Sequence, residues 1–188
     1  MLFVHAGNRI DLADRPTARF AQSEVPMVAA RVGQLLATFR PVAVVSAAAA
    51  GADLVVLQEA IEQGIAVHVV LPIGREGFVE QSVADTGAEW VQRFDAVMAH
   101  VSSDARCSLV EGDADPASAW YEGGHDLLLQ RAEALAGGDV IVALTIRPPE
   151  GETPPSVSDA FAARAERLGL LTLCIDPRAR SASTAVVR

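Results

Sequence analysis

Short apolar runs alternate along this chain with longer segments in which apolar residues recur every three or four positions. The apolar runs predict six strands, at Leu2–Ala6, Val42–Ser46, Ile65–Leu71, Arg106–Val110, Asp139–Ile146 and Leu170–Ile175. Helical spacing predicts helices at Val25–Phe39, Ala52–Gln63, Glu76–Val83, Glu89–Val101, Ala117–Leu135 and Ser158–Leu168. Strands that alternate with helices are typical of a parallel sheet. We therefore expect an α/β fold, a Rossmann-like three-layer sandwich with a mostly parallel sheet of five or six strands and helices on both faces.

Polar segments separate these elements. Residues 8–24 are polar and irregular, and Arg147–Val157 is an acidic, proline-rich loop. The pattern shows no internal repeat and no second domain. We expect a single Rossmann-like domain over residues 1–176 and a flexible C-terminal tail over residues 177–188, where small and polar residues prevail.

The net charge of the chain limits the classes of partner that this domain is expected to bind. The 188 residues include 15 basic and 24 acidic side chains, which gives a net charge of −9, and every basic residue is an arginine. An acidic chain is a poor general binder of nucleic acids or anionic membranes, because both present negative phosphate groups. The lack of lysine excludes Schiff-base chemistry and a Walker-type phosphate loop, since both need its amine.

Targeting and metal signals are equally sparse. No run of 18 apolar residues predicts a membrane-spanning helix, and the N-terminus lacks the basic start of a signal peptide. We interpret Cys107 and Cys174, both in apolar strand-like runs, as reduced and packed thiols of a cytoplasmic protein. The histidines are scattered and no C-x-x-C or H-E-x-x-H spacing occurs, so we expect no metal site.

Candidate ligand contacts lie where the expected strands end, because ligands of parallel α/β sheets bind at the carboxyl ends of the strands. Small residues there let a ligand approach the backbone, and the N–H groups at a helix start attract phosphate. The predicted ligand contacts are Gly7, Asn8, Arg9, Ser46, Ala47, Ala50, Gly51, Ala52, Asp53, Pro72, Arg75, Tyr121, His125 and Thr145. Several have an alternative structural interpretation: Gly7 as a turn residue, Asp53 as a carboxylate that stabilises a helix start, Arg75 as a solvated side chain and His125 as a packed one.

Catalytic patterns are weak. The chain has no G-x-S-x-G nucleophile elbow. Glu59 lies eight residues after Gly51 on the helix that follows the small-residue loop, and it is a candidate general acid or base if that helix face points into the cleft. The polar neighbours Gln58, Glu62 and Gln63 favour a solvated helix face instead.

The chain resembles a known superfamily over about residues 1–175, most strongly from residue 44 to residue 98. It reads VVSAAAAGAD over 44–53, then Glu59-Ala60, Gly64, HVVLP over 68–72 and REGF over 75–78, followed by Ser82-Val83, Glu89-Trp90-Val91 and Arg93-Phe94. These residues resemble the SLOG superfamily of Rossmann-like domains, which includes LOG-type cytokinin-activating phosphoribohydrolases, DNA-processing proteins, molybdenum-cofactor carriers and nucleotide sensors. The closest similarity is to SLOG-like domains beside nucleotidyl cyclase or tetratricopeptide modules in bacteria. The resemblance implies a nucleotide or nucleotide-derived ligand and a sensor role in signalling.

The chain departs from this family at its phosphate loop. LOG-type enzymes carry P-G-G-x-G-T-x-x-E with a catalytic glutamate, and the cyclase-associated relatives carry W-D-G and G-G-T strings, whereas residues 145–153 here read TIRPPEGET. Three hypotheses stay open. The domain binds a small phosphate-bearing ligand and reports it to a signalling partner; or it is a nucleoside-monophosphate phosphoribohydrolase, an N-glycosidase that uses Glu59 or Asp53; or it is a degenerate interaction module that acts as a homodimer.

Overall fold

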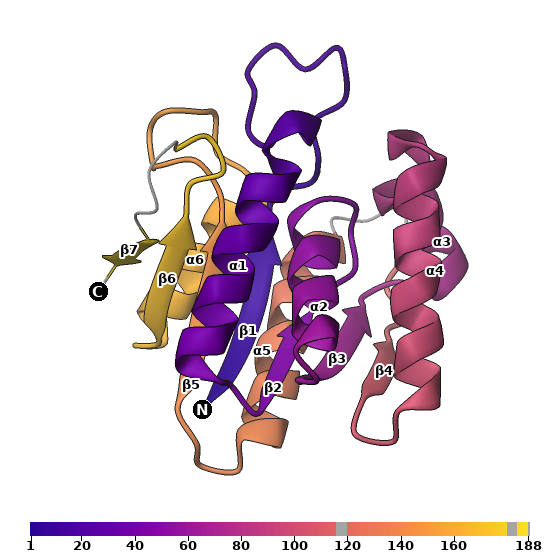
Figure 1. Ribbon diagram of the computed structural model, residues 1–188, viewed down its shortest axis with the longest axis vertical. Coiled ribbons are helices and arrows are strands. Elements are labelled where there is room, and N and C mark those ends of the chain that lie inside the picture. Colours follow the sequence, from indigo (N-terminus) through magenta and orange to yellow (C-terminus); the bar gives the residue numbers. More distant parts are fainter. Residues whose placement is uncertain (116–119, 180–183, 188) are drawn as a thin grey trace.

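The computed structural model describes residues 1–115, 120–179 and 184–187 of the chain. Its strands form one sheet in the order β4-β3-β2-β1-β5-β6-β7 (Figure 1). Their bounds are Leu2–Gly7 (β1), Ala43–Ser46 (β2), Ala66–Leu71 (β3), Ser108–Glu111 (β4), Ile141–Ile146 (β5), Leu171–Ile175 (β6) and Thr184–Val187 (β7). Strands β1 to β6 are all parallel, and β7 runs antiparallel to β6.

Helices cover both faces of this sheet. Their bounds are Val25–Phe39 (α1), Ala52–Glu62 (α2), Arg75–Ser82 (α3), Ala88–Ser103 (α4), Trp120–Ala136 (α5) and Val157–Arg167 (α6), with short 3₁₀ turns at Gln22–Glu24 (η1) and Ala84–Thr86 (η2). Helices α1, α2 and α4 pack on one face, whereas α5 and α6 pack on the other, as Figure 1 shows. The expected α/β sandwich with a mostly parallel sheet is therefore confirmed.

The strands read as continuous apolar runs because both of their faces are buried. Successive side chains of a strand point to opposite faces. In β1, Phe3 packs into the core beneath α1, α2 and α4, whereas Leu2 and Val4 pack into the core beneath α5 and α6. Strand β1 thus contributes to two cores, which favours apolar residues on both of its faces.

Most predicted bounds agree with the structure to within about two residues, and the larger departures concern the helix over 117–135 and the C-terminal tail. Residues 117–119 of the predicted helix over 117–135 lie outside the described residues, and α5 continues to Ala136. Within the segment expected to be a flexible tail, Thr184–Val187 forms β7 on the edge of β6, while residues 180–183 and 188 lie outside the described part. A strand of four residues carries little periodicity of its own, so its pairing depends on the edge that β6 offers.

The strand order places a crevice at one edge of the sheet. The chain runs outward from β1 through β2 and β3 to β4, and then returns to β5 on the other side of β1. Strand order therefore reverses between β1 and β5, and open α/β sheets bind ligands beyond the carboxyl ends of the strands at such a reversal. Among the described residues, no helix combines the length and the apolar character that crossing a membrane requires.

Candidate functional site

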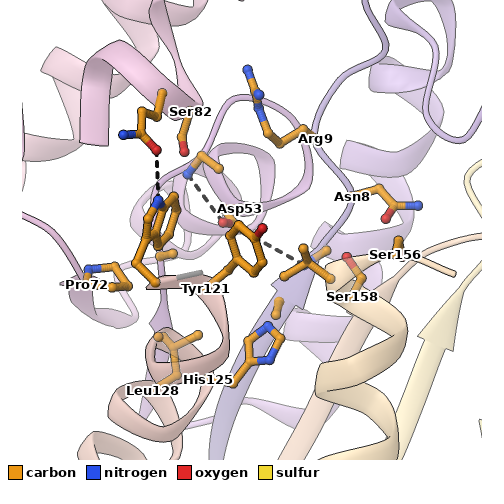
Figure 2. A pocket seen from close by; sticks show the side chains of 18 of the residues that line it. Asn8, Arg9, Asp53, Pro72, Ser82, Tyr121, His125, Leu128, Ser156 and Ser158 are labelled. Atoms are coloured by element: carbon orange, nitrogen blue, oxygen red, sulfur yellow. Dashed lines mark hydrogen bonds between the residues drawn. The ribbon is translucent and has the colours of Figure 1, made fainter. Parts of the chain in front are cut away.

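A cavity of about 340 Å³ lies at the carboxyl ends of β1, β2 and β3, between them and the start of α5 and α6 (Figure 2). Eight of the predicted ligand contacts line it: Gly7, Asn8, Arg9, Ala47, Asp53, Pro72, Tyr121 and His125. The cavity thus lies where the reversal in strand order places ligands, and it brings together predicted residues from the ends of β1, β2 and β3 and from α5.

The other predicted contacts do not line this cavity. They are Ser46, Ala50, Gly51, Ala52, Arg75 and Thr145. Thr145 is buried in the sheet, where its hydroxyl donates to the Leu173 carbonyl oxygen at 3.3 Å. Arg75 is exposed and pairs with Asp95 at 3.1 Å, with its guanidinium over the Phe94 ring. Both side chains therefore have structural partners away from the cavity.

Glu59 is also outside the cavity. It lies in a separate polar hollow with Gln58, Glu62 and Arg93, on the face of the sheet that α1, α2 and α4 cover. Burial, and then the negative charge of Glu62, raise the pKa of Glu59. The helix face that carries Glu59 points away from the cavity. Glu59 therefore cannot act as a general acid or base on a ligand bound in the cavity.

The small residues before α2 make room mainly for protein backbone. The Ile10 N–H donates to the Ala50 carbonyl oxygen at 2.9 Å, and the Ala52 N–H donates to the Asn8 carbonyl oxygen at 3.1 Å. Arg9 and Gly51 form a β-bridge between these bonds. The first amide of α2 is therefore used inside the protein, and only Ala47 and Ala49 of this loop face the cavity.

Asp53 is held at the cavity by main-chain donors. Its carboxylate accepts the Gly7 N–H at Oδ1 and the Ala49 N–H at Oδ2, each at 3.3 Å. The fully buried His5 donates from Nδ1 to the Leu144 carbonyl oxygen at 2.9 Å, which turns its Nε2 to 3.3 Å from Asp53 Oδ1, without the alignment of a hydrogen bond. These contacts place a nearly buried carboxylate, 6% exposed, beside a histidine at one wall of the cavity.

His125 faces the same cavity from α5. Burial lowers the pKa of this imidazole, and the negative charge of Asp53 opposes that shift. Its ring packs edge-on against Phe161, with the centroids 5.4 Å apart. Because its pKa is lowered, His125 is a neutral imidazole at physiological pH, able to donate one hydrogen bond and accept another.

The positive end of the cavity was not predicted. Arg15 and Arg19 line it from the loop between β1 and α1, and Ser156 and Ser158 line it from the start of α6. Arg15 pairs with Asp11 at 2.8 Å, whereas Arg19 donates to the carbonyl oxygens of Pro154 and Pro155 and pairs with no carboxylate in the described ranges. A carbonyl does not neutralise a guanidinium, so Arg19 keeps its full charge at the cavity.

The start of α6 adds main-chain donors to this end. Ser156 caps the helix, because its Oγ accepts the Asp159 N–H at 3.3 Å while the Asp159 carboxylate accepts the Ser156 N–H at 2.7 Å. The cap uses the amides of Ser156 and Asp159, but not those of Val157 and Ser158 between them. The partial positive charge at a helix start attracts anions to such amides. The Ser156–Asp159 spacing was a signal available in the sequence, but nothing local indicated that it faces the cavity.

An aromatic wall closes the opposite side. Phe78, Trp120 and Tyr121 line it, with ring centroids 5.8 Å apart for Phe78 and Trp120 and 5.5 Å apart for Trp120 and Tyr121. The Trp120 indole N–H donates to Gln81 Oε1 at 2.8 Å, which fixes the ring. Tyr121 was predicted from the sequence, whereas Trp120 and Phe78 were missed. A planar ligand group would find stacking partners here.

Asn8 carries the clearest sign of a missing partner. It is 5% exposed and lines the cavity, yet its side-chain amide nitrogen donates to no group in the described part of the chain. A buried donor without an acceptor costs about 1–3 kcal/mol. Figure 2 shows Asn8 on the side of the cavity where Ser156 and Ser158 lie. A ligand with acceptor atoms at this point would satisfy the amide.

Comparison with protein-family models and with curated proteins found no match to this chain. A function for this chain is therefore inferred from the chemistry of the cavity.

Proposed function

We propose that this domain binds a small phosphate-bearing ligand, a nucleotide or nucleotide-derived molecule, in the cavity at the carboxyl ends of β1 to β3. The observation that carries the proposal is the division of the cavity into two chemically different ends. One end has Arg19 and the Asn8 amide, which have no carboxylate and no acceptor, respectively, among the described residues, together with the start of α6. The other end has the aromatic wall.

The two ends fit the two halves of a nucleotide. Arginine and helix N-termini bind phosphate, and aromatic rings stack on bases. The Asp53 carboxylate lies between them, where it would accept hydrogen bonds from sugar hydroxyls. A volume of about 340 Å³ falls within the usual range of small-molecule sites. The resemblance to SLOG-like sensors supports the same ligand class, and a sensor would report binding to a signalling partner.

Thermal unfolding with added ligands tests the proposal. Adenosine and guanosine monophosphates, ribose 5-phosphate and the free nucleosides are compared at millimolar concentration. Ligand at 100 times its Kd adds about 2.7 kcal/mol of stability, which raises the Tm of a domain of this size by roughly 5–11 °C. No shift with any nucleotide, sugar phosphate or dinucleotide would overturn the proposal.

Two arginine variants locate the phosphate. Arg19→Ala removes a charge-assisted hydrogen bond and is expected to weaken monophosphate binding by about 10- to 100-fold, while nucleoside binding stays unchanged. Arg75→Ala is the matched control, because Arg75 is an exposed arginine that does not line the cavity. Equal effects of the two substitutions would place the phosphate elsewhere.

A second candidate function is hydrolysis of an N-glycosidic bond at Asp53. The observation that favours it is the nearly buried Asp53 carboxylate beside His5 and His125, because a carboxylate of this kind stabilises the positive charge that develops on a sugar when its base leaves. Incubation with nucleoside monophosphates and chromatographic detection of free base test it. Asp53→Asn is expected to abolish base release while the thermal shift persists, and Glu59→Gln is expected to have no effect. A wild type that releases no base from any common monophosphate would refute this second function.

A further inference from the structure

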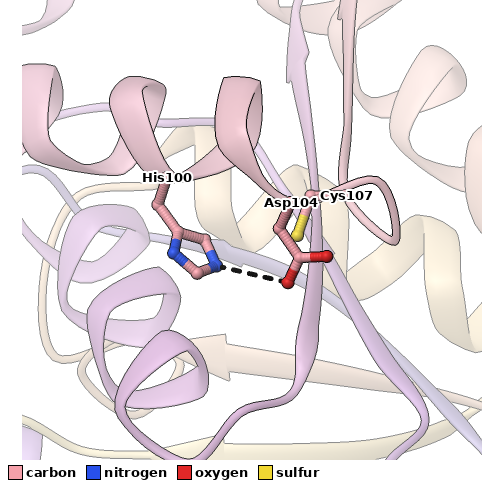
Figure 3. Close-up of side chains that lie close together, drawn as sticks. All are labelled: His100, Asp104 and Cys107. Atoms are coloured by element: carbon pink, nitrogen blue, oxygen red, sulfur yellow. Dashed lines mark ion pairs between the residues drawn. The ribbon is translucent and has the colours of Figure 1, made fainter.

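A group of three potential metal ligands lies at the opposite end of the strands from the cavity. His100 is in the last turn of α4, Asp104 follows that helix directly, and Cys107 immediately precedes β4. All three are half-buried, and their ligand atoms lie within 4.8 Å of one another (Figure 3). Within the part of the chain that the structure describes, no other group of three such side chains is this close.

Local structure brings the three together. Residues four apart on a helix share a face, so His100 Nε2 and Asp104 Oδ2 lie 3.9 Å apart. The Cys107 N–H then donates to the Asp104 carbonyl oxygen at 2.9 Å, which turns the chain back so that the thiol meets the same face. The spacing H-x-x-x-D-x-x-C differs from C-x-x-C and from H-E-x-x-H, which is why the sequence predicts no metal site.

The spacing fits a tetrahedral ion. Zinc binds imidazole nitrogen, carboxylate oxygen and thiolate sulfur at about 2.0–2.3 Å, which separates tetrahedral ligand atoms by about 3.3–3.8 Å. The 3.9 Å between His100 Nε2 and Asp104 Oδ2 is already close to this separation. The other pairs of ligand atoms lie within 4.8 Å, so side-chain rotations that move these atoms by about 1 Å would bring them to tetrahedral spacing. One thiolate and one imidazole favour zinc-class transition metals over Mg²⁺ or Ca²⁺, which prefer oxygen.

We propose that His100, Asp104 and Cys107 bind a zinc-class divalent cation, with water at the fourth position. The ion would link the end of α4 to the start of β4. The Val67 N–H donates to Cys107 Sγ at 3.4 Å, which helps to hold the sulfur in place beside β3.

Arg106 is the competing group. Its guanidinium donates to Asp104 Oδ2 at 2.7 Å, on the oxygen that faces His100. It also donates from Nε to Asp104 Oδ1 at 3.2 Å and from Nη1 to the Gly64 carbonyl oxygen at 3.1 Å, and a bound metal must displace its contacts with Asp104. The side chain is 62% exposed, so its charge stays solvated when it turns away. The Arg106 backbone N–H still donates to Asp104 Oδ1 at 2.9 Å, which keeps the carboxylate oriented when the guanidinium leaves.

Cobalt and zinc titrations test the site on reduced, tag-free, metal-free protein. Co²⁺ is expected to bind one ion per chain and to give the thiolate charge-transfer band and the intense visible bands of tetrahedral coordination. Zn²⁺ is expected to displace it and to raise the Tm. Cys107→Ser should abolish the charge-transfer band and weaken zinc binding by at least about 100-fold, more than the loss of a supporting residue usually costs.

Cys174→Ser is the matched control, because Cys174 is the other half-buried free thiol and lies on β6. It is expected to bind both metals as the wild type does. His100→Ala and Asp104→Asn should each weaken zinc binding, and circular dichroism of the metal-free variants verifies that they fold. Zinc binding by Cys107→Ser at wild-type affinity, or loss of the cobalt spectrum in Cys174→Ser, would overturn the proposal.

Discussion

Gly51, in the loop before α2, has no room for an added side chain. Its backbone adopts φ +119° and ψ −127°, a conformation open mainly to glycine. A Cβ there would lie 2.8 Å from the Arg9 carbonyl carbon and from the Asn8 carbonyl oxygen, and closer still to the Ile10 nitrogen. All three are backbone atoms, fixed by hydrogen bonds to Ala50 and Ala52, so no side-chain rotation relieves the contact.

Gly51→Ala is therefore expected to lower the free energy of unfolding by two separate amounts. The backbone conformation costs about 1–3 kcal/mol for alanine, and overpacking costs about 1–3 kcal/mol. Their sum of about 2–6 kcal/mol is a large part of the 5–15 kcal/mol that holds a domain folded.

Two further glycines separate these contributions. Gly64, at φ +69°, has open space around its missing Cβ, so Gly64→Ala bears the conformational cost alone, about 1–2 kcal/mol. Gly123 lies in α5 with ordinary helical φ and open space, so Gly123→Ala is expected to stabilise by about 0.5–1 kcal/mol.

Urea unfolding followed by circular dichroism measures all three variants. A shift in midpoint at constant m-value reports a change in stability alone. If Gly51→Ala loses no more than Gly64→Ala, the backbone of residues 8–10 yields to the added methyl group, and the close approach deduced from the structure is not a constraint.

Other predictions concern protonation, capping and fluorescence. Burial lowers the pKa of His125 and of His68, so below about pH 6.5 the unfolded chain binds protons that the folded chain does not. The free energy of unfolding therefore decreases as the pH is lowered, by at most about 1.4 kcal/mol per pH unit for each group. Unfolding at pH 7.5 and 5.5 should show a shallower loss in His125→Gln, and an unchanged slope would contradict the buried, neutral imidazole. Ser156→Ala removes the cap of α6 and should cost about 1 kcal/mol in urea unfolding. Nucleotide binding should quench tryptophan fluorescence through Trp120, so Trp120→Phe should lose the quench, because the remaining Trp90 is buried in the core away from the cavity.

Much of the fold was predictable because its signals are local. Strands buried on both faces give unbroken apolar runs such as Ile65–Leu71, and helices covering a face give apolar residues at helical spacing. Gly64 follows the predicted helix Ala52–Gln63 directly, and it adopts a positive φ just past the end of α2, where glycine is the favoured residue. Strand β7 escaped because its four residues depend on the edge of β6 rather than on a pattern of their own.

The candidate site was predictable only in part. Asn8, Asp53 and Tyr121 were found because they follow strands or begin helices near the carboxyl edge, and position along an element is a local property. Arg15 and Arg19 were missed because they lie within a long polar loop whose course no periodicity defines. Gly51 was predicted to make room for a ligand, whereas in the structure it makes room for the backbone of residues 8–10. Only the folded chain contains this contact.

The sequence by itself determined the α/β class and the alternation of elements, because burial repeats with the period of each element. From that alternation it predicts a ligand at the carboxyl edge of the sheet. Tertiary structure alone decided which side chains share the cavity. His5 meets Asp53, and Arg19 meets the start of α6, because β2 and β5 pair on either side of β1. That pairing joins residues far apart in the chain, and no local pattern records it.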